Sequence, residues 1–198
     1  NPVLIDSKKI EEALVEYGVG SVLNVGSHTL SLDEWEHVMD NVHGAYLSKK
    51  SKTPIIYGID AIHGVNYTIG STLFPQEIGL AATWNPELAK QFGEVTAYET
   101  RASGIHWNFS PVLDLGRQPL WSRTFETLGE DPFLASEMGK AIINGYQGKN
   151  GVDSEHIASC LKHFVGYSNP MSGRDRTPAW IPEKYMEELY FPPFKAAV

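Results

Sequence analysis

The sequence predicts an α/β fold in which parallel strands alternate with helices. Amphipathic helical stretches alternate with short apolar runs along the 198 residues, which is the pattern of successive strand-helix units. A capping residue followed by Pro opens two of the helical stretches. With 42% hydrophobic residues, the chain is long enough to bury a sizeable core. A barrel and a doubly wound sheet both fit this pattern.

The first half of the chain contains two predicted helices and two predicted strands. Apolar positions at helical spacing predict a helix at 6–17, and an apolar run predicts a strand at 21–25. A capping-box pattern opens a second helix at 31–47. The apolar run 53–59 predicts the next strand, which ends on Asp60. Asp60 is therefore expected at the C-terminal end of a strand.

The second half continues the alternation of helices and strands. Two helices are expected to open with a capping Asn or Asp followed by Pro at the first helical position. The helices are expected at 85–104, 131–146 and 181–198, and the strands at 106–113 and 159–165. Pro192-Pro193 must break or kink the last of these helices.

Four strand-helix units are half of a closed (β/α)₈ barrel, which has eight. We therefore expect the chain to supply about the first four units of such a barrel. Its last strand would have an unpaired apolar edge, which promotes aggregation unless further chain or a partner covers it. We predict that the segment alone is unstable or depends on the missing half.

Composition and spacing exclude several classes of function. Sixteen basic and 24 acidic residues give a formal charge of −8, so nucleic acid is not expected as a partner. No apolar run approaches the length of a membrane span. The histidines show no metal-ligand spacing and Cys160 is alone, so no metal and no other cofactor is expected. No phosphate-binding turn and no esterase motif is found.

Polar residues at the predicted strand ends are the candidates for chemistry, because the active site of an α/β barrel lies on that face. Asp60 can accept hydrogen bonds from hydroxyl groups, although turn-forming is an equally common role there. Arg123 can bind hydroxyls or pair with a nearby Glu, and Arg174 projects from the same face. Lys162 and His163 interrupt an apolar strand, and a buried Lys needs a partner. Adjacent strand residues point to opposite faces, so the backbone must be distorted if both reach one site.

Five motifs occur along the chain: Gly-Ile-Asp-Ala-Ile-His-Gly (58–64), Phe-Pro-Gln-Glu-Ile-Gly-Leu-Ala-Ala-Thr-Trp (74–84), Ser-Pro-Val-Leu-Asp-Leu (110–115), Ser-Arg-Thr-Phe-Glu-Thr-Leu-Gly-Glu-Asp-Pro (122–132) and Cys-Leu-Lys-His-Phe-Val-Gly (160–166). In this order and spacing they resemble the N-terminal domain of glycoside hydrolase family 3, and in particular its bacterial β-glucosidases. The resemblance runs along essentially the whole chain. It implies a TIM-like (β/α)₈ barrel.

The resemblance implies a role for each candidate residue. Asp60 resembles the carboxylate that holds two hydroxyls of the terminal sugar. The other residues that resemble hydroxyl ligands are Arg123, Lys162, His163 and Arg174.

The resemblance implies two further features of the site. Glu126 matches a position that orients Arg123. Non-proline cis peptide bonds are implied around Lys162-His163-Phe164, on both sides of His163. They would allow adjacent side chains to reach the same pocket.

The implied activity is that of an exo-acting retaining β-glucosidase, which removes terminal non-reducing β-D-glucosyl residues from oligosaccharides. Retaining hydrolysis needs a carboxylate nucleophile and a second carboxyl as acid/base. In the family the nucleophilic Asp lies in a Ser-Asp-Trp-like motif on a later barrel strand, and the acid/base Glu usually belongs to a following domain. Neither of the motifs that carry these two residues occurs in this sequence. The chain would then bind the sugar, with the rest of its barrel and a C-terminal domain as partners. A β-xylosidase and a non-catalytic carbohydrate-binding module remain alternatives.

The chain departs from the family's patterns in one stretch. Residues 117–123 are Arg-Gln-Pro-Leu-Trp-Ser-Arg where many members have Arg-Asp-Pro-Arg-Trp-Gly-Arg, which puts only the outer pocket in doubt. Members that act on N-acetylglucosamine carry an Asp-Ser/Thr-His motif after Lys-His, and 168–177 contains no His, so that subgroup is disfavoured. A periplasmic or secreted location is favoured, with the cytoplasm left open.

Overall fold

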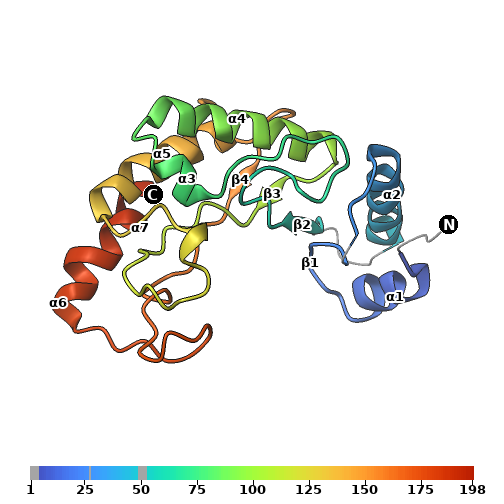
Figure 1. Cartoon of the computed structure of the whole chain (residues 1–198). Coiled ribbons are helices and arrows are strands. Elements are labelled where there is room, and N and C mark those ends of the chain that lie inside the picture. The colour runs from blue at the N-terminus through green and yellow to red at the C-terminus, as the bar shows by residue number, and fades with distance from the viewer. Residues whose placement is uncertain (1–4, 27, 49–52) are drawn as a thin grey trace.

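The structure is a computed structural model that describes residues 5–26, 28–48 and 53–198, and among them it contains a four-stranded parallel sheet (Figure 1). Each strand pairs with the next one along the chain, so the sheet order is β1-β2-β3-β4. The outer strands β1 and β4 each have one neighbour within the described residues. The expected α/β class with four successive strand-helix units is confirmed. The strands are β1 Ser21–Leu23, β2 Ile56–Ile59, β3 Trp107–Asn108 and β4 Ala158–Ser159.

Helices connect and cover the strands, and the longer ones begin where the capping residues predict. The side chains of Asp6, Asn85 and Asp131 accept hydrogen bonds from the first free backbone N–H groups of their helices. The α-helices are α1 Ser7–Glu11, α2 Leu32–Ser48, α3 Glu77–Ala81, α4 Pro86–Ala102, α5 Pro132–Gln147, α6 Glu183–Tyr185 and α7 Phe191–Ala197. The other helical segments are π-helical Glu12–Glu16 and Met186–Tyr190 and 3₁₀-helical Thr124–Glu126.

All four strands are shorter than the sequence predicts. β1 ends at Leu23, two residues earlier than expected. β2 begins at Ile56, three residues later than expected. The runs at 106–113 and 159–165 form ladders only at β3 and β4, since Pro111 has no N–H to donate to a ladder. One isolated bridge between Val112 and Lys162 continues the pairing beyond them.

Two helical features differ from the expectation. α3 lies in the connection between β2 and α4, where no helix was predicted. The predicted break at Pro192-Pro193 takes the form of a change from a π-helical to an α-helical segment at Phe191. Both prolines then lie in the first turn of α7, the part of an α-helix that tolerates Pro best.

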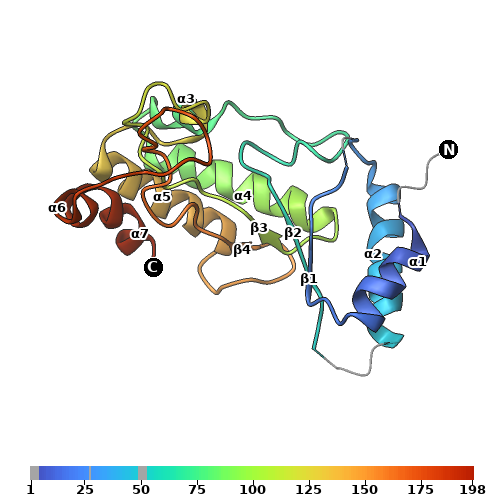
Figure 2. The same cartoon turned by 90° about the horizontal axis from the view of Figure 1, so that it is seen from below.

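The apolar core has two parts, one around α4, α5 and the C-terminal helices and one around α1, α2 and β2. α4 and α5 lie side by side in both ribbon views (Figures 1 and 2). Glycines allow this approach: a Cβ atom on Gly145 would lie 2.2 Å from the Lys90 carbonyl oxygen, and one on Gly93 2.5 Å from the Ile142 carbonyl oxygen. These two helices therefore form a tightly packed layer on one face of the sheet.

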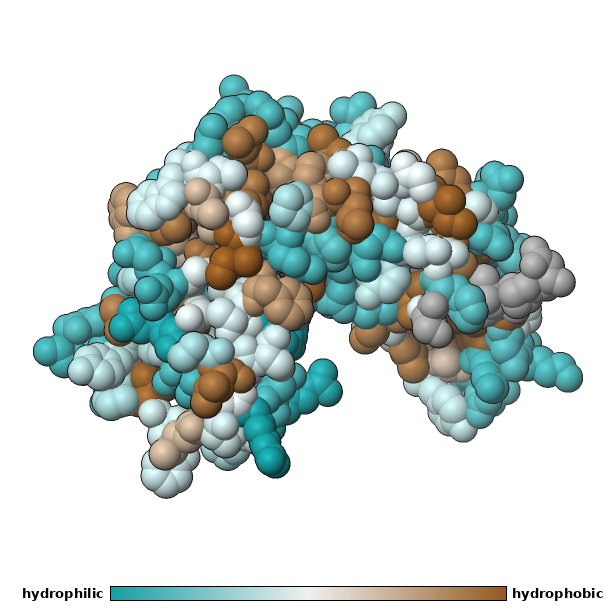
Figure 3. Space-filling view, in the orientation of Figure 1, coloured by the Kyte–Doolittle hydropathy of each residue, from teal (hydrophilic) through white to brown (hydrophobic). Residues whose placement is uncertain are grey.

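The surface is hollowed between the part formed by α1 and α2 and the part formed by α6 and α7 (Figure 3). Apolar side chains also line an open groove of about 540 Å³ beside α7, where Phe164 is 68% exposed. The groove is formed by Leu161, Phe164, Phe191, Phe194, Lys195 and Val198. Within the described ranges, no helix combines the length and apolar character needed to cross a membrane.

Candidate functional site

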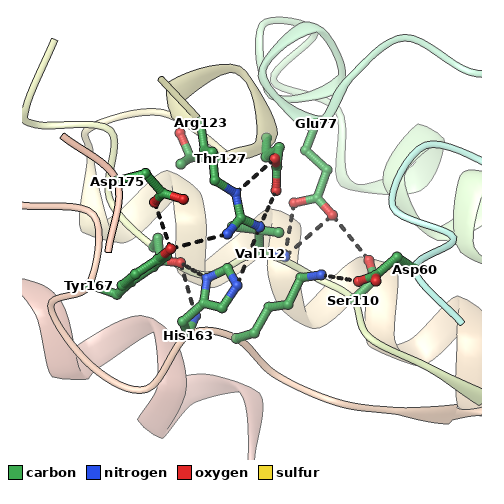
Figure 4. A network of polar contacts seen from close by, with 12 residues as sticks. Asp60, Glu77, Ser110, Val112, Arg123, Thr127, His163, Tyr167 and Asp175 are labelled. Carbon is green, nitrogen blue, oxygen red and sulfur yellow. Dashed lines mark hydrogen bonds and ion pairs between the residues drawn. The ribbon is translucent and has the colours of Figure 1, made fainter. Parts of the chain in front are cut away.

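Polar side chains converge where the chain leaves each strand of the sheet. Asn24 follows β1, Asp60 follows β2, and Lys162 and His163 come shortly after β4. Asp114 lies beyond β3, next to the bridge between Val112 and Lys162. Because all strands are parallel, these ends lie on one side of the sheet, and Figure 4 shows the resulting network.

Asp60 is held from two sides. Lys162 Nζ donates to its Oδ1 at 2.5 Å, and Asn24 Nδ2 donates to its Oδ2 at 2.7 Å. The backbone N–H of Asp60 in turn donates to Asn24 Oδ1 at 2.9 Å. Burial opposes the charge of Asp60, but the hydrogen bonds from Asn24 and Lys162 and the charges of Lys162 and Arg123 outweigh it and lower its pKa. Asp60 is therefore a fixed, ionised acceptor.

Arg123 is oriented by a bidentate ion pair with Glu126. Its Nε and Nη2 donate to the two carboxylate oxygens of Glu126 at 2.9 and 2.7 Å, and this pairing is the main reason why the pKa of Arg123 is raised. The guanidinium carbon also lies 5.7 Å from the ring centre of Tyr167 and 5.9 Å from that of Trp121. Arg123 is thus held by one carboxylate and two rings.

Lys162 and His163 both reach the site although they are adjacent in sequence. The peptide bond between them is cis, as the resemblance implies. The second non-proline cis bond joins Phe164 to Val165, so the expectation of a cis bond on the other side of His163 is wrong. His163 Nδ1 lies 2.6 Å from Asp114 Oδ2, and its Nε2 lies 3.3 Å from Arg123 Nη2.

Glu77 is a fully buried carboxyl group beneath these side chains. Ser110 Oγ donates to its Oε1 at 3.1 Å, and the backbone N–H of Val112 donates to its Oε2 at 3.1 Å. Burial raises the pKa of Glu77 to about 8, against the opposing effects of Ser110, Val112 and Lys162. Val112 bridges to Lys162, so Glu77 braces the backbone that carries the site lysine.

Arg174 lies outside this network. It is exposed, and the hydrogen bonds that it makes among the described residues involve its backbone: its N–H donates to Ser172 Oγ at 3.1 Å, and its carbonyl oxygen accepts from Thr177 Oγ1 at 2.7 Å. The neighbouring Asp175 does join the network, since its Oδ1 accepts from Tyr167 at 2.6 Å and from Trp121 at 2.8 Å. The structure thus brings together Asp60, Arg123, Lys162 and His163, but not Arg174.

Several residues of the network escape sequence reasoning. Asp114 directly follows a predicted strand and Asn24 lies near the end of one, and these positions were the available signal. Glu77 lies in the motif at 74–84, but nothing in its spacing indicated a buried carboxyl group. Tyr167 and Asp175 lie in a polar loop with no distinguishing spacing. No group of three or more His, Cys, Asp or Glu that could hold a metal ion occurs in the part of the chain that the structure describes.

Three known proteins show how far the likeness extends. The lysosomal beta glucosidase of Dictyostelium discoideum is 39% identical over all of this chain and 26% of its own length. The periplasmic beta-glucosidase/beta-xylosidase of Dickeya chrysanthemi is 39% identical over 57% of this chain and 17% of its own. The exo-1,3/1,4-beta-glucanase of a Pseudoalteromonas species superposes with a TM-score of 0.85 at 32% identity, covering 98% of this chain and 25% of that one.

The chain thus spans about a quarter or less of the length of each of these proteins. The family model described as the glycosyl hydrolase family 3 N terminal domain matches residues 3–198. Together with the parallel sheet, this match confirms the resemblance drawn from the five motifs. The chain belongs to glycosyl hydrolase family 3, as a part of its N-terminal barrel domain.

Proposed function

We propose that the full-length protein is an exo-acting retaining β-glucosidase and that this chain holds the terminal sugar of the substrate. The observation that carries the proposal is the convergence of Asp60, Arg123, Lys162 and His163 at the strand ends. They combine a carboxylate acceptor, two cationic donors and an imidazole, which matches the alternating donors and acceptors of sugar hydroxyls. The β-glucosidase names of relatives support the choice of glucose.

Asp60 acts in this proposal as a hydroxyl ligand and not as the nucleophile. Both of its oxygens already accept hydrogen bonds from Lys162 and Asn24, which leaves neither free to attack a sugar carbon, and its lowered pKa does not suit the acid/base role. A retaining mechanism needs two further carboxyl groups on either side of the glycosidic bond. We place them in the remainder of a longer polypeptide, which completes the barrel and adds a second domain.

The location proposed for the full-length protein is the periplasm or the outside of the cell. The support for it is the periplasmic relative in Dickeya chrysanthemi.

A β-xylosidase is the second candidate activity, because the same Dickeya protein carries both activities in its name. Kinetics of the full-length protein on matched aryl β-glucoside and aryl β-xyloside separate the two. We expect the higher kcat/KM on the glucoside. A preference for the xyloside favours the second candidate. Saturable sugar binding without hydrolysis of either substrate would make the protein a binding module instead.

A further inference from the structure

The side-chain hydrogen bonds of Asp114 go to one residue of the site, His163. Its side chain is fully buried, and its Oδ2 accepts both the backbone N–H of His163 at 2.9 Å and the hydrogen bond at ring Nδ1 at 2.6 Å. Its other oxygen, Oδ1, is buried and has no hydrogen-bond partner among the described residues. Burying a carboxylate with one unsatisfied oxygen costs free energy, which calls for a compensating role. The hydrogen bonds of Oδ2 both go to His163, so we take that role to be the orientation of His163.

The backbone explains why these two residues meet. The Leu113 N–H donates to the Lys162 carbonyl oxygen at 2.8 Å, and Val112 bridges to Lys162. Asp114 and His163 are the residues that follow this pairing on the two segments. The pairing therefore brings a carboxylate from the β3 side next to an imidazole from the β4 side.

The opposite ring nitrogen faces a group that can only donate. Arg123 Nη2 lies 3.3 Å from His163 Nε2, and a guanidinium carries N–H donors but no acceptor. Nε2 must therefore present its lone pair to Arg123. Glu126 fixes the direction of the guanidinium, so His163 cannot avoid this donor by a small rotation. The ring proton is left to Nδ1, where Asp114 accepts it.

We propose that Asp114 is a positioning residue that holds His163 in the Nδ1-protonated tautomer, so that Nε2 accepts a hydrogen bond from a hydroxyl of the bound sugar. This inference rests on the proposed function, because it takes His163 as a sugar ligand. The site then contains two acceptors, Asp60 and His163 Nε2, and two donors, Lys162 and Arg123. Because Nε2 has one lone pair, the sugar hydroxyl replaces Arg123 Nη2 as the donor to Nε2, and the hydroxyl oxygen can in turn accept from the Arg123 guanidinium. A fluorine at that position can accept but cannot donate.

Neutron diffraction from crystals of the full-length protein at neutral pH, grown in deuterated solvent, tests the tautomer directly. We expect deuterium on Nδ1 of His163 and none on Nε2. Deuterium on Nε2 would overturn the inference. This measurement uses the unaltered protein, so it identifies the tautomer of His163 even where a substitution at Asp114 prevents folding.

The kinetic test compares aryl β-glucoside with its 3-, 4- and 6-deoxyfluoro analogues. His163→Ala identifies the position at which His163 discriminates hydroxyl from fluorine. At that position we expect the unaltered protein to prefer hydroxyl by about 10-fold or more, and Asp114→Ala to reduce the preference to about 3-fold or less. The preferences at the other two positions stay unchanged. Asp114→Asn, which keeps an oxygen facing Nδ1, restores most of the preference.

The outcomes separate this inference from the proposed function. A purely structural role of Asp114 would lower kcat/KM equally for all four glucosides, and this result contradicts the inference. Absence of hydrolysis by the unaltered protein contradicts the proposed function, whereas the neutron map still reports the tautomer of His163.

Discussion

Asp60 and Lys162 neutralise each other's charge in the site by forming an ion pair. Lys162 has 11% of its side chain exposed, and its ammonium group meets the Asp60 carboxylate 102 residues away in sequence. Asn24 completes the contacts of Asp60 with two hydrogen bonds. Asp60 follows β2 and Lys162 follows β4, so the sheet fixes the position of both charged groups. Their side chains therefore need not move to bind sugar hydroxyls.

Glu77 makes stability depend on pH in a defined direction. Its pKa is raised from 4.5 to about 8, so the folded state keeps a proton that the unfolded state has released between these two values. This contribution to stability is fully present below the lower value and is lost as pH rises through the upper one.

We predict that Glu77→Gln weakens the fall in unfolding free energy of the full-length protein between about pH 5 and pH 8. Denaturant titrations at several pH values measure this slope. The exposed Glu36→Gln on α2 is the matched control and should leave the slope unchanged. Identical slopes for Glu77→Gln and the unaltered protein would show that Glu77 is ionised throughout.

At the scale of elements, the contact between α4 and α5 depends on two glycines. A Cβ atom on Gly145 would lie 2.2 Å from the Lys90 carbonyl oxygen, and backbone atoms cannot move aside as a flexible side chain can. We predict that Gly145→Ala lowers the unfolding free energy of the full-length protein by about 1–3 kcal/mol through overpacking.

The matched control for this substitution is Gly44→Ala on α2. A Cβ atom there meets nothing within 4 Å, so Ala should stabilise the helix by about 0.5–1 kcal/mol. Thermal or denaturant unfolding of both variants provides the comparison. Equal effects of the two substitutions would contradict the close approach of α4 and α5.

The order of helices and strands was predictable because it depends on local signals. Caps such as Asn85 and Asp131 and the apolar runs of the strands are visible in short windows of sequence. Strand lengths were overestimated, since the pairing that ends a ladder at Asn108 depends on Pro111 and on the geometry of the neighbouring segment.

The site was predictable only where a residue conflicts with its surroundings. Lys162 interrupts an apolar strand and Asp60 ends one, so both drew attention before any contact was known. Asp114 follows a predicted strand and Glu77 lies in one of the five motifs, but the role of each depends on a partner, 49 and 35 residues away respectively, that only the fold brings near. Contacts of this range leave no local signature in the sequence.

At the scale of the whole molecule, the four strands found among the described residues do not close a barrel, and apolar side chains remain uncovered. The groove beside α7 includes Phe164 at 68% exposure and Phe191 at 40%. We predict that residues 1–198 alone bind a dye specific for exposed apolar surface and unfold without a sharp transition. Calorimetry and light scattering check this. A monodisperse monomer with cooperative unfolding would contradict it.

The central claim is that this chain holds the terminal sugar while the nucleophile lies elsewhere. The most direct measurement is mass-spectrometric mapping of the full-length protein after reaction with a 2-deoxy-2-fluoro β-glucoside, in unaltered, Asp60→Asn and exposed Asp40→Asn forms. We expect all three to be labelled outside residues 1–198, and Asp60→Asn to lose about 100-fold or more in kcat/KM while Asp40→Asn loses nothing. A covalent label on Asp60 itself would contradict the account.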